Sequence, residues 1–201
     1  WGIVMLNTAI INLVLLQQNA KAIKSILPPF VKFIAVVKAD AYGHGLVEVS
    51  SAIYPYVDAY AVALPEEGVT LRSSGIDKDI LVLTPPVGGD YDLAVKYDLT
   101  LSVQTEDEIS LLDSVANSYN KIVKAQIAVN TGMNRFGVLP TDIDVIIKKL
   151  KKSSRIAVDG VYSHLYQPQN PLTRIKQSRE FCAVANKVKD SFPFAYAHLS
   201  A

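Results

Sequence analysis

"KFIAVVKADAYGHG", residues 32–45, is the stretch that decides which fold the chain is expected to have. Its first eight residues form an apolar run rich in valine, which is typical of a β-strand. In an extended strand alternate side chains point to the same face, so Ile34, Val36 and Lys38 are expected to share one face. Two glycines follow in the loop, where they allow tight turns and the close approach of a ligand. The stretch therefore predicts a strand that delivers a lysine to its carboxyl end.

Six further apolar runs follow along the chain, and segments with helical periodicity lie between them. The strand-like runs are 59–64, 80–84, 99–104, 122–130, 156–165 and 194–200, and the helical segments are 46–57, 66–74, 106–118 and 141–152. The pairs Thr105 with Glu108 and Thr141 with Asp144 predict capped helix starts. Seven strands that alternate with helices predict an α/β protein with a parallel sheet, because each parallel return needs a crossover helix.

This alternation fits both an open doubly wound sheet and a (β/α)8 TIM-type barrel. The barrel is favoured because several strands end in polar residues of different kinds and no glycine-rich phosphate fingerprint follows the first strand. Seven strands are one short of eight, and the sequence stops at Ala201, directly after a strand-like run. Residues 1–201 are therefore expected to form one incomplete barrel domain, truncated before closure, with residues 1–13 as a lead-in strand.

The composition restricts the classes of function. Half of the 201 residues are apolar, which is enough to bury a sizeable core. The 20 basic and 19 acidic residues give a net charge of +1, which does not indicate a nucleic-acid partner. The apolar stretch 3–16 is too short to span a bilayer and lacks the basic flank of a signal peptide, so no membrane association is expected. The single Cys182 forms no internal disulfide, and a cytoplasmic location without a metal site is predicted.

At the carboxyl end of a barrel strand, Lys38 would stand where barrel active sites are built. A partly desolvated lysine there offers a neutral amine that can attack a carbonyl carbon and form a Schiff base. The alternative is a solvated lysine that ends a strand, and the strand pattern alone does not decide between the two. Tyr42 in the same loop offers a hydroxyl group to an anion, although packing is the commoner role of a loop tyrosine.

The loop and four later segments resemble the alanine racemase family. Residues 35–45 are similar to the lysine motif V-K-A-x-A-Y-G-H-G, in which the lysine carries pyridoxal 5'-phosphate. The other matches are "INLVLLQQN" (11–19) with I-D-L-x-A-L-x-x-N, "VNTGMNRFG" (129–137) with V-D-T-G-M-x-R-x-G, "GVYSHL" (160–165) with G-x-x-S-H-L, and "AHLSA" (197–201) with the start of H-x-x-N-S-A. The resemblance therefore runs from about residue 11 to the last residue.

The resemblance implies an isomerase that interconverts L- and D-alanine by two-base proton transfer at Cα and supplies D-alanine for peptidoglycan. Lys38 would carry pyridoxal 5'-phosphate and serve as the base on one face of Cα. A tyrosine from the C-terminal β-domain of the partner subunit would serve the opposite face, so a homodimer is expected. That β-domain is absent from the sequence, and residues 1–201 alone are therefore expected to be inactive.

Four other residues receive cofactor-site roles from the resemblance. Arg135 would contact the phenolic oxygen of the cofactor and the carboxylate of the substrate, and both groups suit a guanidinium. Tyr42 would donate to the phosphate and His164 would lie beneath the pyridine ring. His198 would also belong to the cofactor site. For both histidines the alternative is a hydrogen-bonded position in the core.

Two positions depart from the family pattern, and three other functions stay open. Ala128 stands where many members have a lysine that is often carbamylated, and Asn130 replaces an aspartate, so negative charge is lost near Arg135. One alternative function is a non-catalytic, single-domain pyridoxal-phosphate carrier of the same barrel type, whose lysine motif lacks A-Y-G-H-G. The others are a decarboxylase of basic amino acids, which the T-G-M-x-R match disfavours, and a racemase for another amino acid such as serine.

Overall fold

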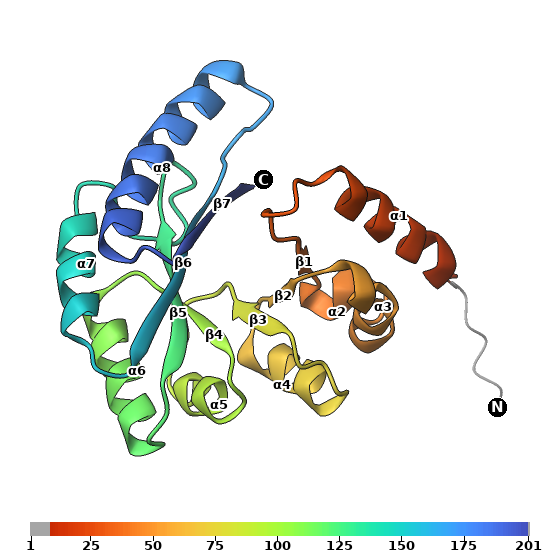
Figure 1. The fold of residues 1–201 in the computed structure, drawn as a ribbon, viewed down its shortest axis with the longest axis horizontal. Helices are drawn as coiled ribbons and strands as arrows, with labels where there is room; N and C mark the ends of the chain where they lie inside the picture. The colour runs from red at the N-terminus through yellow and green to blue at the C-terminus, as the bar shows by residue number, and fades with distance from the viewer. Residues whose placement is uncertain (1–8, 201) are drawn as a thin grey trace, which may run out of the picture.

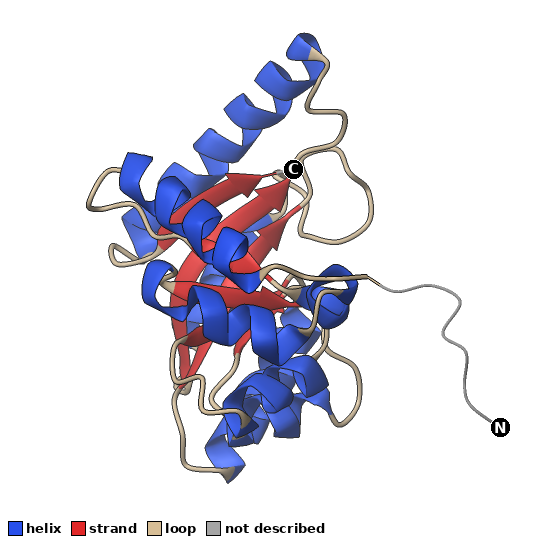
Figure 2. Ribbon diagram, turned by 90° about the vertical axis from the view of Figure 1, so that its right-hand side faces the viewer, coloured by secondary structure: helices blue, strands red, loops and turns tan. Residues whose placement is uncertain are grey.

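The computed structural model describes residues 9–200, which form a single curled sheet with helices along its outer side (Figures 1 and 2). The sheet contains seven parallel strands in the order β1-β2-β3-β4-β5-β6-β7. The strands are β1 (Ile34–Val36), β2 (Ala59–Val62), β3 (Asp79–Val82), β4 (Thr100–Val103), β5 (Val123–Val129), β6 (Ile156–His164) and β7 (Tyr196–Ser200). Six of them lie within the predicted runs and β3 begins one residue before its run, at Asp79, which confirms the parallel α/β prediction.

The strand order distinguishes the two folds that the sequence left open. A doubly wound sheet reverses its strand order at a switch point, whereas a (β/α)8 barrel adds each strand beside the previous one. Every strand here pairs with its sequence neighbour, and β1 and β7 are the two edges of the sheet. The described residues therefore form an incomplete barrel, as predicted.

Helices connect successive strands and cover the convex side of the sheet (Figure 1). They are α1 (Leu13–Ile26), α2 (Lys38–Gly43), α3 (Leu46–Ile53), α4 (Pro65–Ser73), α5 (Asp90–Lys96), α6 (Glu106–Ser118), α7 (Ile143–Lys152) and α8 (Pro171–Ser191), with a 3-10 turn at Tyr54–Tyr56. The capping box of Thr105 and Glu108 is confirmed at the start of α6. The capped helix start predicted at Thr141 and Asp144 is wrong. Helix α7 begins after Asp142, whose side chain makes no capping hydrogen bond.

The lead-in strand expected over residues 1–13 falls mainly on residues 1–8, which lie outside the described part of the chain. Residues 9–12 are not in a strand, and α1 begins at Leu13. Asn12 caps this helix, because its side-chain oxygen accepts a hydrogen bond from the Leu15 backbone N–H at 3.1 Å. The asparagine thus acts as a helix cap in this chain. No helix among residues 9–200 is long and apolar enough to cross a bilayer.

The core lies between the sheet and the outer helices. Ile80, Leu101 and Ile127 of the central strands and Leu112 of α6 are all fully buried. At the β1 edge the expected alternation is visible, because Ala35 and Val37 are buried whereas Val36 is 44% exposed. Ile34, Val36 and Lys38, which were predicted to share one face, are each more exposed than the two residues between them.

Candidate active site

The chain leaves β1 through a left-handed turn that begins directly after Lys38. Ala39, Asp40, Ala41 and Tyr42 all have positive φ, between 51° and 56°, so the expected strand over 32–39 ends early, at Val36. Left-handed conformations cost roughly 1–2 kcal/mol for each non-glycine residue, and such strain concentrates at functional sites. Lys38 therefore stands at the start of a backbone segment that the rest of the fold has to hold in place.

Hydrogen bonds on both sides hold this turn. Asp40 accepts from the Leu46 N–H at 2.7 Å through its side chain and from the Gly45 N–H at 3.0 Å through its backbone carbonyl. The Ala39 N–H donates to the Glu67 carboxylate at 2.6 Å. Both acidic side chains are used as acceptors for backbone groups, so the loop is fixed by its own fold before any ligand binds.

The structure brings Lys38, Arg135 and His164 together at the carboxyl end of the sheet. His164 ends β6, Arg135 lies in the loop after β5, and Lys38 follows β1. Partial burial lowers the pKa of His164, and the positive charges of Arg135 and Lys38 lower it further. A neutral imidazole beside two cations results, because protonation would add a third positive charge to the same place.

Arg135 lies on a loop whose shape depends on Asn130. The Asn130 side-chain oxygen accepts from the backbone N–H groups of Gly132 at 3.1 Å and Asn134 at 3.0 Å. Gly137 closes the loop, and a Cβ added there would lie 2.6 Å from the Asn130 nitrogen, so no other residue fits. Asn130 therefore replaces the expected aspartate as a loop organiser.

Arg135 is an exposed residue of this loop, and its guanidinium group packs on a neighbouring ring. It lies 4.8 Å from the centre of the Phe136 ring. Within residues 9–200 the ion pairs all involve lysine, and Arg135 forms none. An exposed guanidinium without a carboxylate partner is suited to bind an anion.

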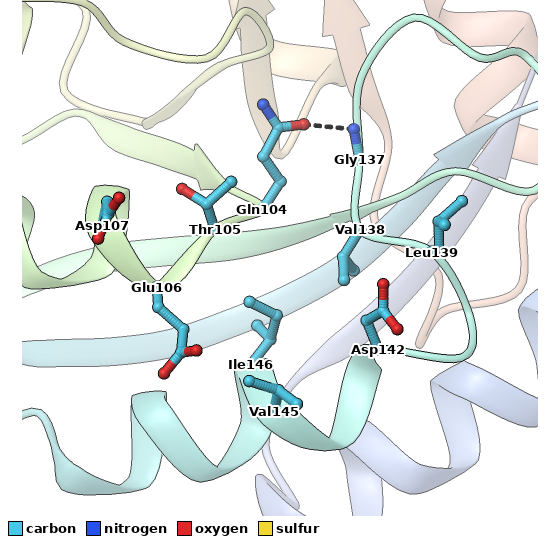
Figure 3. A pocket seen from close by; sticks show the side chains of 10 residues that line it. All are labelled: Gln104, Thr105, Glu106, Asp107, Gly137, Val138, Leu139, Asp142, Val145 and Ile146. Carbon is cyan, nitrogen blue, oxygen red and sulfur yellow. Dashed lines mark hydrogen bonds between the residues drawn. The ribbon is translucent and has the colours of Figure 1, made fainter.

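The Arg135 loop is also bound to the end of β4. Gln104, directly after β4, accepts a hydrogen bond from the Gly137 N–H through its side-chain oxygen, and Figure 3 shows its amide group pointing at that nitrogen. Beside this contact lies an open cavity of 530 Å³ between the starts of α6 and α7. Of the predicted site residues, none lines this cavity, so it is separate from the cluster around Lys38.

Tyr162 spans the concave side of the sheet below the mouth. The register pairs Tyr162 with Ala128, and the small alanine leaves space for the ring to cross β5. The Tyr162 hydroxyl lies 2.7 Å from Ser102 Oγ on β4 and donates to the Leu83 carbonyl at 3.2 Å. Burial raises its pKa to about 12, although the Ser102 bond and the Arg135 charge oppose this rise. Tyr162 therefore stays protonated beneath Arg135.

His198 lies deeper than His164, inside the polar layer of the barrel. Its ring stacks on Tyr162, with centroids 5.0 Å apart, and its Nε2 lies 2.8 Å from the side-chain oxygen of the fully buried Gln126. Gln126 also donates to the hydroxyl of Tyr196. These contacts place His198 among hydrogen-bonded groups inside the curled sheet, where its partners are Gln126, Tyr162 and Tyr196.

The partly buried position of His198 predicts a loss of stability in acid. Burial lowers the pKa of His198 from 6.5 to about 4. The unfolded chain therefore gains a proton below pH 6.5 that the folded chain resists, and stability falls as the pH falls from 6.5 toward 4. Between pH 7 and pH 5 we expect this residue to remove about 2 kcal/mol of unfolding free energy. Urea unfolding at the two pH values measures the loss.

The variant His198→Gln serves as the control. It lowers stability at both pH values because the ring stack is lost, yet the difference between pH 7 and pH 5 should shrink by about 2 kcal/mol. His164 and the carboxylates titrate in both proteins, so their contributions to the pH dependence of the unfolding free energy cancel in the comparison. An unchanged pH difference in the variant would mean that His198 is protonated as readily in the folded chain as in the unfolded one.

Tyr42 is the last residue of the left-handed turn after Lys38. It is 60% exposed and its φ is 56°. Its backbone carbonyl lies 3.1 Å from Nδ1 of His44, which also lies 2.9 Å from the Ala41 carbonyl. His44 therefore fixes the loop, and the Tyr42 hydroxyl faces solvent at the same end of the sheet as Lys38.

Three residues of this region were not singled out from the sequence. Glu67 binds the turn after Lys38, Gln104 binds the Arg135 loop, and Gln126 binds His198. A signal for Glu67 was present, since "PEEG" after an apolar run has a proline and a glutamate at the positions that start a helix. The two glutamines had no such signal, because their partners lie 33 and 72 residues away in sequence.

Comparison with known proteins places these features in a family. A family model described as the alanine racemase N-terminal domain matches residues 11–201. The chain belongs to the alanine racemase N-terminal domain family. Among curated relatives, the alanine racemase of Halothermothrix orenii is 41% identical over 155 residues, which cover 77% of this chain and 41% of that protein. Alanine racemase 2 of Clostridium acetobutylicum is 36% identical over 168 residues, which cover 82% of this chain and 42% of that protein.

Solved structures agree with the alanine racemase fold. The alanine racemase of Clostridium difficile 630 superposes with a TM-score of 0.86 at 28% identity, covering 94% of this chain and 53% of that one. The Bacillus anthracis enzyme with bound L-Ala-P gives a TM-score of 0.84 at 27% identity, covering 93% of this chain and 50% of that one. This chain therefore spans about half of the structures and 41–42% of the curated alanine racemases that it matches.

Proposed function

We propose that the full-length protein is an alanine racemase that uses pyridoxal 5'-phosphate. The observation that carries this proposal is the convergence of Lys38, Arg135 and His164 at the carboxyl end of the strands, where their charges interact. The names of the relatives support alanine as the substrate. Supply of D-alanine for peptidoglycan and a cytoplasmic location remain predictions.

The residues present fit the chemistry of pyridoxal 5'-phosphate. The cofactor carries an aldehyde, a phenolic oxygen, a phosphate and a flat aromatic ring. Lys38 offers the amine for the aldehyde. Arg135 offers the phenolic oxygen a guanidinium that has no ion-pair partner within residues 9–200, and the exposed Tyr42 offers a hydroxyl for the phosphate. The imidazole of His164 is kept neutral by its surroundings, so it suits a contact with an aromatic ring. His198 would support the site from below through its stack on Tyr162.

Each residue then has a defined part in the reaction. When bound, the cofactor acts as an electron sink that weakens the Cα–H bond of the amino acid. Lys38 Nζ would take a proton from one face of Cα or return it there. Arg135 would hold the substrate carboxylate, so that Cα stays within reach of Lys38. We assign the second base to the part of the protein beyond this chain, contributed by the other subunit of a homodimer.

A trapping experiment tests the lysine assignment. Full-length protein loaded with pyridoxal 5'-phosphate is reduced with borohydride, digested and mapped by mass spectrometry. We expect the cofactor on Lys38, because its amine is the one that meets Arg135 and His164. Lys32 is the internal control, because it lies just before β1, at the opposite end of the strand, with its Nζ 4.3 Å from the centre of the Tyr196 ring. Label on Lys32, or no label, would contradict the proposal.

A further inference from the structure

We propose that Glu67 is a positioning residue that fixes the direction in which Lys38 leaves β1. The inference rests on the proposed function, because it gives Glu67 a part in presenting the cofactor lysine. Glu67 lies in the first turn of α4, in the unit that follows β2, and it does not itself contact the reacting atoms. Its role would be to act through the backbone next to Lys38.

The carboxylate of Glu67 joins two neighbouring strand ends. Oε2 accepts from the backbone N–H groups of Ala63 at 2.7 Å and Leu64 at 3.0 Å, directly after β2. Oε1 accepts from the backbone N–H of Ala39 at 2.6 Å. One side chain thus connects the end of β2 to the residue that follows Lys38.

The bond to Ala39 acts at the start of the left-handed run. Ala39 is the first of the four left-handed residues, with φ at 53° and ψ at 53°. Its N–H belongs to the peptide group that carries the Lys38 carbonyl, so holding this N–H fixes the rotation of that peptide. Because the left-handed run is intrinsically unfavourable, loss of the bond would let the peptide rotate and turn the Lys38 side chain away from the cluster.

Comparison with Glu108 separates this bond from ordinary helix capping. Glu108 occupies the same helix position in α6, where Oε2 accepts from the N–H groups of Gln104 at 2.8 Å and Thr105 at 3.2 Å. Its Oε1 accepts from the Gln104 side chain, within the same unit. Both glutamates therefore cap their helices, but only Glu67 uses its second oxygen to bind a loop that lies 28 residues earlier.

The variant Glu67→Gln tests the proposal in the full-length protein. A glutamine keeps one acceptor oxygen and turns an NH2 group toward the other N–H donors, so either Ala39 or the end of β2 loses its acceptor. Two readouts are used. The first is hydrogen exchange of the peptide that contains Ala39 in the cofactor-free protein, and the second is the rate at which pyridoxal 5'-phosphate becomes borohydride-trappable on Lys38.

We expect exchange at Ala39 to become roughly 3- to 10-fold faster and trapping on Lys38 to slow by a similar factor. Glu67→Asp keeps the charge but is one methylene shorter, so it should shift both readouts in the same direction. Glu66→Gln removes a charge from the same helix turn, where Glu66 binds Thr70 only through its backbone carbonyl. Glu108→Gln removes the equivalent cap from α6 and controls for general destabilisation.

The outcomes separate this inference from the proposed function. Changes at Ala39 and Lys38 in the Glu67 variants, with Glu66→Gln and Glu108→Gln like wild type in exchange at Ala39, support the positioning role. The positioning role is overturned if exchange at Ala39 changes equally in all four variants, or if Glu67→Gln changes neither exchange at Ala39 nor trapping on Lys38. If wild type shows no trapping on Lys38 while exchange at Ala39 still depends on Glu67, the proposed function fails but the control of the Lys38 turn by Glu67 stands.

Discussion

Replacing Lys38 by alanine in the full-length protein is expected to lower the rate of alanine racemisation by about 10⁴-fold or more. Lys38 is assigned two tasks, because it anchors the cofactor and exchanges the proton on one face of Cα. A positioned general base alone contributes roughly 10²- to 10⁴-fold, and loss of the covalent anchor adds to this. A coupled assay for D-alanine, run at saturating pyridoxal 5'-phosphate, measures the effect.

The matched control for this variant is Lys32→Ala. Lys32 lies before β1, at the opposite end of the strand, and contacts the Tyr196 ring. Its loss removes one cation–π contact, and we expect activity within about twofold of wild type. If Lys38→Ala keeps substantial activity, or if Lys32→Ala loses as much activity as Lys38→Ala, the assignment of the cofactor to Lys38 is wrong. Another lysine would then carry the cofactor, and the cluster of Lys38, Arg135 and His164 would not be the cofactor site.

Residues 1–201 produced alone are expected to racemise alanine at least about 10²-fold more slowly than the full-length protein. Inversion at Cα requires a proton donor on the face opposite Lys38, and a positioned acid–base group contributes roughly 10²- to 10⁴-fold. We assign that group to the portion of the protein outside this chain, which spans 41–42% of its curated relatives. The comparison uses both proteins at equal concentration in the coupled D-alanine assay.

Cofactor trapping on the shorter chain shows whether a low rate has the expected cause. Lys38, Arg135 and His164 all lie within it, so borohydride should still place some cofactor on Lys38. The strands β1 and β7 are sheet edges here, and size-exclusion chromatography would detect association through them. Comparable racemisation rates for the two proteins would show that both bases lie in residues 1–201, and the cross-subunit assignment would have to be abandoned.

The sequence alone determined the number of strands and their parallel arrangement. The seven apolar runs are each bounded by polar or turn-forming residues, and strand formation depends on this local pattern. The start of α6 was equally local, because the Thr105 and Glu108 pair is three residues apart. The motif around Lys38 and the T-G-M-x-R segment also identified which loops carry the candidate site. These predictions needed no contact between distant parts of the chain.

Only the tertiary structure decided how those loops are held. Residues 39–42 carry no local signal for four successive left-handed conformations. These persist because the Glu67 carboxylate binds the Ala39 N–H at the start of the run and the Asp40 side chain binds the Leu46 N–H after it. The start of α7 was misjudged from Thr141, because the Asp142 N–H donates to the Leu139 carbonyl in a turn and the helix begins only after Asp142. His198 is a polar core residue because Gln126, 72 residues away, meets it inside the curled sheet. Contacts between residues so far apart in sequence depend on the order and curvature of the strands. The pattern of side chains within one segment does not determine either of these.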